Sequence, residues 1–437
     1  MQYSPSRRTA LVLCGTGAHG AYHAGVVRAL QEAGVRIDLV AGHGVGAAGA
    51  MLAAIDGAGR LWEPEGIWRS SQSQSLYGWT PTIRLVRWAF VALIVSLLIP
   101  LVLIVVSPST ALVQQVARAA LVVLVVAVAA IAGTIGVARS QRQSRRRAAG
   151  NRWWDIAGAP FDATQAVRLF SETVWQLIRG ASLDPRPPQE SGRRYADVLA
   201  ESLGQPGFRE LMIVATDLDA HGDVVAALLR EPYRHDFVAP RAGRERRAEA
   251  FDLAGTGREH ALDIMAAALT PPVGCEPRLV TFASDGYWRG ETHRLCDRPG
   301  AVVRLFDELA AAAVSQLIVV TAVPIAFAPH RLRALRLDMR SRLGEFIAAA
   351  ESAALHDAVS LARLRFDACY VIRPPHNPVG PFDVSGAYDE ASDRRHSTAE
   401  LMERGYEDVY HQFIEPIVGA SGDQLARADS HEPSSLA

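Results

Sequence analysis

Residues 39–51, LVAGHGVGAAGAM, have the pattern of a strand that enters a tight glycine turn and continues as a helix. This is the arrangement of a nucleophile elbow, in which the central residue of GxSxG is a serine that attacks an acyl carbon. The central residue here is Gly44, flanked by Gly42 and Gly46, and no nearby serine or threonine can replace it by a shift of register. The elbow is therefore predicted to lack its nucleophile.

A second glycine turn, LCGTGAHGAYHAG, satisfies GxGxxG with Gly15, Gly17 and Gly20 between a predicted strand and a predicted helix. Its backbone N–H groups could hold the pyrophosphate of a dinucleotide. They could instead form an oxyanion hole, in which each donor contributes roughly 3 kcal/mol to acyl transfer. A dinucleotide site needs an acidic residue at the end of the next strand, but Asp38 stands at its start. Nucleotide binding is thus the weaker reading, and a plain turn without a ligand stays open.

Three histidines lie close to these turns in the sequence. His43, inside the elbow, could help to activate a water, although packing or solvation is the more common role for such a histidine. His19 and His23 follow the glycine turn, and we expect them on the surface of the first helix.

The composition excludes several classes of function. The 437 residues include 45 basic and 46 acidic side chains, which gives no general reason to expect a nucleic-acid partner. Four cysteines are widely scattered without a CxxC pair, and the sequence predicts free thiols in a reducing compartment. No Cys/His spacing is typical of a metal site, so we expect neither metal nor cofactor.

Two apolar runs, residues 88–107 and 119–138, each contain 20 positions without a charged side chain. About 20 helical residues at 1.5 Å rise cross a bilayer core. The segment between them, SPSTALVQQVAR, is short. The sequence therefore predicts a transmembrane hairpin in contact with membrane lipid.

Arginines around these runs predict the orientation of the chain. Arg84 and Arg87 precede the hairpin, five arginines follow it within residues 139–147, and Arg118 alone lies between the two runs. By the positive-inside rule both outer ends face the cytoplasm. We expect an integral membrane protein whose remaining residues form a cytoplasmic domain of undetermined oligomeric state.

Alternating patterns outside the hairpin predict an α/β domain with a mostly parallel sheet covered on both faces. Strands are expected at residues 9–14, 36–42, 211–218 and 317–325, and helices at 21–34, from about 47, and at 406–419. Residues 371–395, rich in proline, are interpreted as a surface loop, with packing over the site as the alternative. The predicted organisation is a first domain part at 8–83, the hairpin at 84–147, a second part at 148–418 and a disordered tail at 419–437.

Taken in order, the glycine turn, the elbow and the later segment FASDGYWRGETH resemble the patatin-like phospholipase family. The resemblance implies a three-layer α/β fold and a lipid acyl ester as substrate. It also implies an oxyanion loop at Gly15, Thr16, Gly17, His19 and Gly20, and an elbow at Gly42, His43, Gly44 and Gly46. Asp285, followed by Gly286, takes the place of the aspartate that acts as general base for the serine.

The missing serine separates two functional hypotheses. In the family, serine and aspartate form a two-member version of the catalytic triad, and loss of the nucleophile from a triad costs about 10⁶ in rate. The chain is therefore expected to be an impaired ester hydrolase that acts on or binds membrane lipid. The alternative is a lipid-binding or scaffolding pseudoenzyme. Nucleotide binding at the GxGxxG turn is a third, less favoured hypothesis.

Overall fold

The computed structural model describes residues 3–106, 110–142, 158–180, 187–239, 248–284, 288, 290–325, 338–389 and 392–419. The chain forms two compact units. The sheet unit comprises Met1–Tyr77, Ala163–Pro272 and Pro277–Ala437, and the hairpin unit comprises Gly78–Asp162 and Val273–Glu276.

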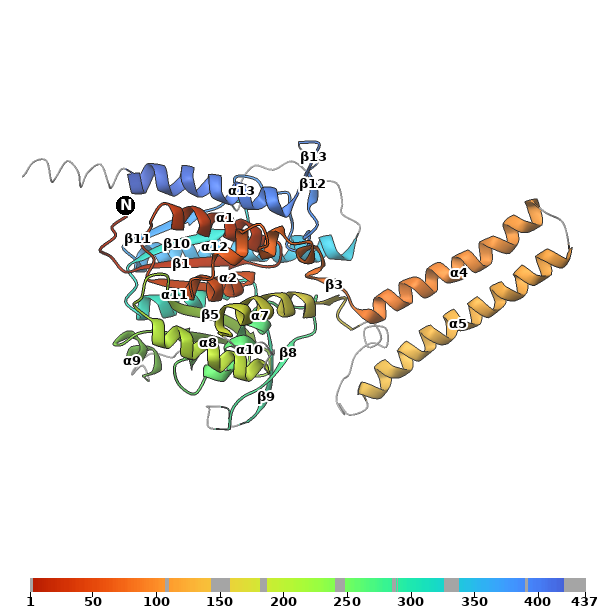
Figure 1. Ribbon diagram of the computed structural model, residues 1–437, viewed down its shortest axis with the longest axis horizontal. Coiled ribbons are helices and arrows are strands. Elements are labelled where there is room, and N and C mark those ends of the chain that lie inside the picture. Colours follow the sequence, from red (N-terminus) through yellow and green to blue (C-terminus); the bar gives the residue numbers. More distant parts are fainter. Residues whose placement is uncertain are drawn as a thin grey trace, which may run out of the picture. The chain divides into compact units, whose positions relative to one another are not determined.

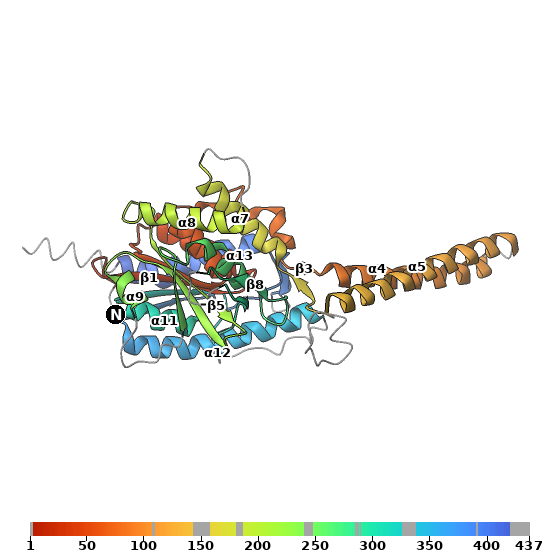
Figure 2. The ribbon, with the colours of Figure 1, turned by 90° about the horizontal axis from the view of Figure 1, so that it is seen from below.

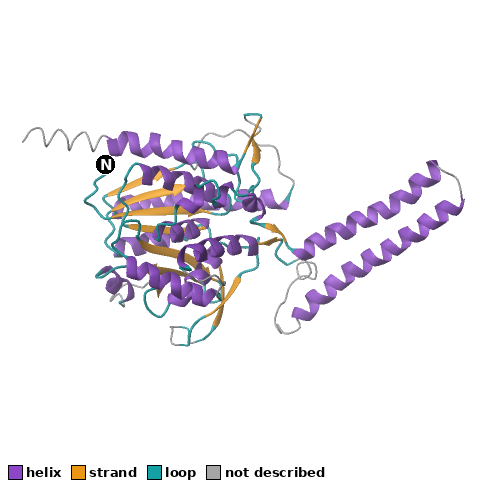
Figure 3. Cartoon of the chain, viewed as in Figure 1, coloured by secondary structure: helices purple, strands orange, loops and turns teal. Residues whose placement is uncertain are grey.

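A nine-stranded sheet in the order β11-β10-β1-β2-β5-β6-β7, with β9 paired to β5 and β8 paired to β9, forms the centre of the sheet unit (Figure 3). Strands β11, β10, β1, β2 and β5 are parallel, and β6 and β9 run antiparallel to β5. The predicted α/β fold with a mostly parallel sheet is therefore confirmed. The strands are β1 Thr9–Gly15, β2 Leu39–Gly44, β5 Glu210–Asp217, β6 Gly222–Leu228, β7 Ala248–Asp252, β8 Arg278–Thr281, β9 Thr292–Cys296, β10 Gln316–Thr321 and β11 Ala368–Ile372.

Helices cover both faces of this sheet, with α7 and α8 on one side and α11 and α12 on the other (Figures 1 and 2). The helices are α1 His19–Glu32, α2 Val45–Ala54, α3 Gly59–Trp62, α7 Thr164–Ile178, α8 Pro188–Ser202, α9 Tyr233–Val238, α10 Ala261–Ala268, α11 Val302–Ala311, α12 Met339–Arg365 and α13 Thr398–Val409. Shorter elements are η1 Ile67–Arg69, η2 Ser71–Ser75, η3 Arg258–His260, the π-helix η4 Tyr410–Gly419 and the strand pair β12 Ala387–Asp389 and β13 Arg394–His396.

Strand β1 is apolar along most of its length because both of its faces are buried. Ala10, Val12 and Cys14 join the buried core beneath α11 and α12, and Leu13 on the opposite face lies against Gly46 of α2. A strand buried on both faces reads as a continuous apolar run, as TALVLC does. All four cysteines of the chain are buried free thiols.

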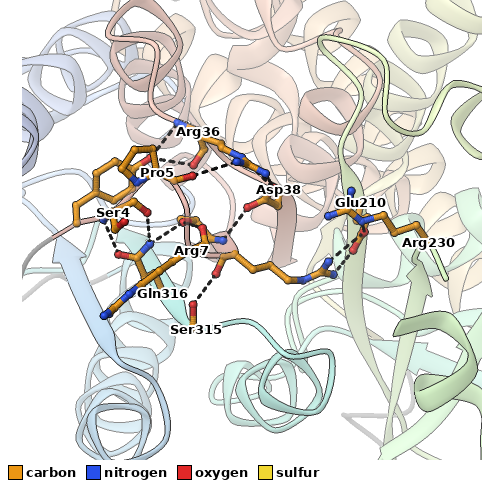
Figure 4. A network of polar contacts seen from close by, with 12 residues as sticks. Ser4, Pro5, Arg7, Arg36, Asp38, Glu210, Arg230, Ser315 and Gln316 are labelled. Carbon is orange, nitrogen blue, oxygen red and sulfur yellow. Dashed lines mark hydrogen bonds and ion pairs between the residues drawn. The ribbon is translucent and has the colours of Figure 1, made fainter. Parts of the chain in front are cut away.

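A polar network fixes the amino ends of the central strands (Figure 4). Asp38 accepts the N–H of Thr9 at 2.9 Å, and the Gln316 side chain bonds both main-chain groups of Ser4. Buried Glu210 pairs with Arg8 and with Arg230, the latter at 2.9 Å. These contacts set the strand register far from the carboxyl ends, where α/β proteins place their sites.

The hairpin unit consists of α4 Pro81–Val106 and α5 Thr110–Arg142, with the short strands β3 Gly78–Trp79 and β4 Phe161–Asp162. Residues Gln114, Gln115 and Arg118, expected in a connecting loop, lie inside α5. In the described ranges, no helix combines the length and the apolar character that crossing a membrane requires. The two membrane-spanning helices predicted at 88–107 and 119–138 are therefore not found.

Large apolar side chains nevertheless face outward along both hairpin helices. Trp88 is 70% exposed, and Leu121, Val122 and Val126 are each 61% exposed. Between the helices lies an apolar cavity of about 400 Å³ whose lining includes Trp88 and Val123. The hairpin unit therefore has an outward apolar surface.

Two glycines allow α1 and α13 to cross at close range. A Cβ on Gly25 would lie 1.8 Å from the carbonyl oxygen of Met402, and one on Gly405 would lie 2.3 Å from that of Tyr22. Both obstacles are backbone atoms, so a side chain at either position must separate the helices. This packing holds α1, and with it the glycine turn at its amino end.

We expect Gly25→Ala to lower the free energy of unfolding by about 1–3 kcal/mol or more, because overpacking at a backbone contact cannot relax. Gly34→Ala is the matched control: Gly34 has φ +65° but no atom near its Cβ position, so the variant loses only about 1 kcal/mol of stability, the cost of left-handed backbone. Chemical denaturation measures both. Equal losses for the two variants would contradict the close crossing.

Candidate functional site

Gly44 forms the turn between β2 and α2 with φ 60° and ψ −137°, a conformation that other residues adopt only under strain. The backbone thus retains the shape of a nucleophile elbow. The space for a side chain is gone, because a Cβ on Gly44 would lie 2.2 Å from the carbonyl oxygen of Gly15. Gly42 and Gly46 are equally crowded, against Gly46 and Leu13 backbone atoms respectively.

Asp297 lies where the side chain of an elbow nucleophile would point. Its Oδ2 is 3.0 Å from the Cβ position of Gly44, and its side chain is 1% exposed. The residue follows β9, and its N–H donates to the carbonyl of Thr270 at 2.9 Å. Its Oδ1 lies 3.5 Å from Nδ1 of His43, which is an ion-pair distance rather than a good hydrogen bond.

Thr16 connects Asp297 to a second buried carboxylate. The Thr16 hydroxyl lies 3.0 Å from Asp297 Oδ2 and 2.6 Å from Oε1 of Glu351 on α12. One hydroxyl proton cannot serve both oxygens at once. The cluster of Thr16, His43, Asp297 and Glu351 therefore requires a further proton or a cation between its carboxylates.

The two histidines of α1 are buried, not on the surface as predicted. Nε2 of His23 lies 3.0 Å from the carbonyl oxygen of Cys14, and Nδ1 of His19 lies 3.8 Å from Oε2 of Glu351. Burial lowers the pKa of His19 to about 4 and that of His23 to about 3. Both imidazoles are therefore neutral at pH 7.

Charges inside the cluster work against burial. Burial alone would lower the pKa of His43, but the facing carboxylate of Asp297 outweighs burial and raises that pKa well above its usual value. For Glu351, burial raises the pKa to about 7, although the charge of His43 opposes the shift. Glu351 therefore titrates near neutral pH, a property common in functional sites.

The glycine turn is covered by the segment 377–383. The carbonyl oxygen of Pro381 accepts the N–H of Ala18 at 2.7 Å and would lie 1.9 Å from a Cβ on Gly17. Gly20 packs against Trp68. The alternative in which the proline-rich loop packs over the site is thus the observed one, and one N–H that an anion would need already has an acceptor.

A cavity of about 170 Å³ adjoins this segment. It is smaller than most small-molecule sites, which measure about 300–1,000 Å³. His19 reaches both this cavity and Glu351, so it connects the cavity to the buried cluster. The lining includes His19, Val323, Arg340, Gly344, Asn377 and Pro381.

The predicted site residues are brought together in part. Gly15, Thr16, Gly17, His19, Gly20 and the elbow converge at the carboxyl ends of β1 and β2. Asp285 and Gly286 lie outside the described residues, so the predicted general base stays a prediction. Asp297 and Glu351 were not singled out from the sequence. Glu351 carried one signal, since it interrupts the stripe of Ile347 and Leu355 on the buried face of α12.

The chain is thus a three-layer α/β protein. It has a strand-elbow-helix turn at the carboxyl edge of its sheet. The profile of the patatin-like phospholipase family matches residues 11–338. The chain belongs to this family, which supports a function of the lipid acyl hydrolase type.

Among solved structures, the chain is similar to VipD from Legionella pneumophila, with a TM-score of 0.33 and 14% identity. The alignment covers 94% of this chain and 68% of VipD. A comparison with curated protein sequences found no match.

The raised pKa of Glu351 predicts a pH-dependent stability. A pKa of about 7 in the folded state lies above that of the unfolded chain, so stability is fully present below about pH 4.5 and declines up to about pH 7. At about 1.4 kcal/mol per pKa unit the loss is roughly 3 kcal/mol. We expect Glu351→Gln to remove this loss in denaturation experiments at several pH values with a chelator present.

The control for this measurement is Asp357→Asn on the same helix. Asp357 is exposed, and its difference from wild type should stay within about 0.5 kcal/mol at every pH. A parallel pH dependence for wild type and Glu351→Gln would show that Glu351 does not titrate in this range.

Proposed function

We propose that this protein is a membrane-associated member of its family that binds lipid acyl esters without forming an acyl-serine intermediate. Family membership supports the ester class. The absence of an acyl-serine intermediate is inferred from Gly44, whose Cβ position is blocked by the carbonyl oxygen of Gly15 at 2.2 Å. A nucleophile elbow without room for a side chain cannot perform nucleophilic catalysis from that position.

The glycine turn favours a non-catalytic role in lipid binding or scaffolding. Pro381 already accepts the N–H of Ala18, and an oxyanion hole needs its donors directed at the developing charge. The same contact disfavours a pyrophosphate at this turn. Hydrolysis at a low rate would require a water activated by other groups.

Association with membrane lipid is supported by the hairpin unit. Its outward apolar side chains and the arginines Arg84 and Arg87 at its start are the combination expected at a lipid surface. The excess of arginine outside the hairpin favours a sheet unit on the cytoplasmic side. Extraction of membranes at alkaline pH distinguishes insertion from surface binding.

We expect Gly44→Ser to remain inactive and to lose about 1–3 kcal/mol of stability or more, because its Cβ meets backbone rather than a movable side chain. Hydrolysis of short- and long-chain acyl esters and labelling by a fluorophosphonate measure this for wild type and variant. Gly34→Ser, with left-handed backbone in open space, is the stability control. Labelling and turnover by Gly44→Ser would contradict the closed elbow and identify an intact dyad.

We expect the double variant Val122→Asp with Val126→Asp to lose flotation with vesicles of anionic phospholipid. Each aspartate at a lipid-facing helix position costs up to roughly 3 kcal/mol. The matched control is Leu364→Asp, since Leu364 is an apolar residue 83% exposed on α12 of the sheet unit. Equal loss in the control, or unchanged flotation of the double variant, argues against binding through the hairpin.

A further inference from the structure

Three buried polar atoms of the cluster beside Gly44 lack hydrogen-bond partners among the described residues. These atoms are Nδ1 of His43, Oδ1 of Asp297 and Oε2 of Glu351, and none has a hydrogen-bond partner among the described residues. Their side chains are 3%, 1% and 6% exposed, respectively. An unpartnered buried polar atom costs about 1–3 kcal/mol, so three within one cluster require a common explanation.

From this cluster we propose that His43, Asp297 and Glu351 form a binding site for a divalent transition-metal ion of the zinc type. One imidazole nitrogen and two carboxylate oxygens are a ligand set typical of zinc sites. The charge also balances once the metal has displaced the proton of His43, because a divalent cation then neutralises the two carboxylates beside a neutral imidazole. The inference concerns metal binding and does not depend on ester chemistry.

The distances suit such an ion. Ligands about 2.0–2.2 Å from a tetrahedral zinc lie about 3.4 Å from one another. The His43–Asp297 pair is 3.5 Å apart, and ligand atoms of all three residues lie within 4.8 Å of one another. Small side-chain rotations would bring the three ligand atoms to this spacing.

The surroundings orient the two carboxylates toward the ion. The Thr16 hydroxyl lies against Asp297 Oδ2 and Glu351 Oε1, which leaves the opposite oxygens, Oδ1 and Oε2, for the metal. Such outer contacts fix ligand orientation. Nδ1 of His19 also has no partner among the described residues and lies 3.8 Å from Glu351 Oε2. His19 lines the 170 Å³ cavity, which gives the fourth coordination position a route to solvent.

The chemistry of the ligands selects among metals. Magnesium and calcium prefer oxygen ligands only, whereas imidazole favours zinc and its first-row neighbours. A shared proton in place of the metal is the competing explanation. It leaves His43 Nδ1 and Asp297 Oδ1 at 3.5 Å, and it predicts no metal binding.

The test uses the full chain, stripped with a chelator and titrated with ZnCl₂ against a chelating dye. We expect one tightly bound zinc per chain. Glu351→Gln and Asp297→Asn should each bind zinc at least about a hundredfold more weakly. Asp357→Asn, exposed on the same helix, should bind as wild type does. Magnesium should not compete.

A second measurement keeps the test independent of whether the variants fold. Cobalt(II) added to the wild-type protein should give the absorption of a four- or five-coordinate nitrogen and oxygen site, which zinc abolishes. The absence of a stoichiometric site in the wild-type protein would overturn the proposal. Equal zinc affinity in wild type and folded Glu351→Gln would also overturn it, because the metal would then bind elsewhere.

Discussion

Strands β1 and β2 remain paired to their last residues, and this pairing governs the site. Gly15 stands opposite Gly44 in the parallel register, so the carbonyl oxygen of Gly15 occupies the space that a side chain at the elbow would need. A change at Gly44 alone therefore cannot rebuild a nucleophile, since the obstacle is the backbone of the neighbouring strand. The elbow has a strained backbone, but the neighbouring strand leaves no room for a side chain at its centre.

At the closed elbow, charged groups lie beside Gly44. Asp297 lies in the side-chain space of Gly44, and Thr16 connects Asp297 to Glu351 of α12. Buried charges are stable only with partners, and here the available partners are His43, a proton or a cation. A proton on Glu351, whose pKa burial raises, and the proposed metal ion are therefore two alternative ways to compensate the negative charge of this cluster.

The two units divide the chemistry of the chain. The sheet unit has a small cavity bordered by histidine, arginine and proline-rich backbone, whereas the hairpin unit has exposed apolar side chains and a larger apolar cavity. Contact with acyl chains suits the second unit far better, because burial of apolar surface supplies its binding energy. The proposed lipid association therefore rests on the hairpin, and the polar chemistry rests on the sheet edge.

The sequence by itself determined the α/β class, the glycine turn, the elbow and the absence of a serine. These are local properties, because a buried strand, a tight turn and the amino end of a helix each follow from neighbouring residues. Only the tertiary structure decided that Asp297 and Glu351 meet His43, because sheet pairing and helix packing join positions more than 250 residues apart in the sequence. It likewise decided that His19 is buried and that Pro381 covers the glycine turn, since burial depends on long-range packing that no local pattern records.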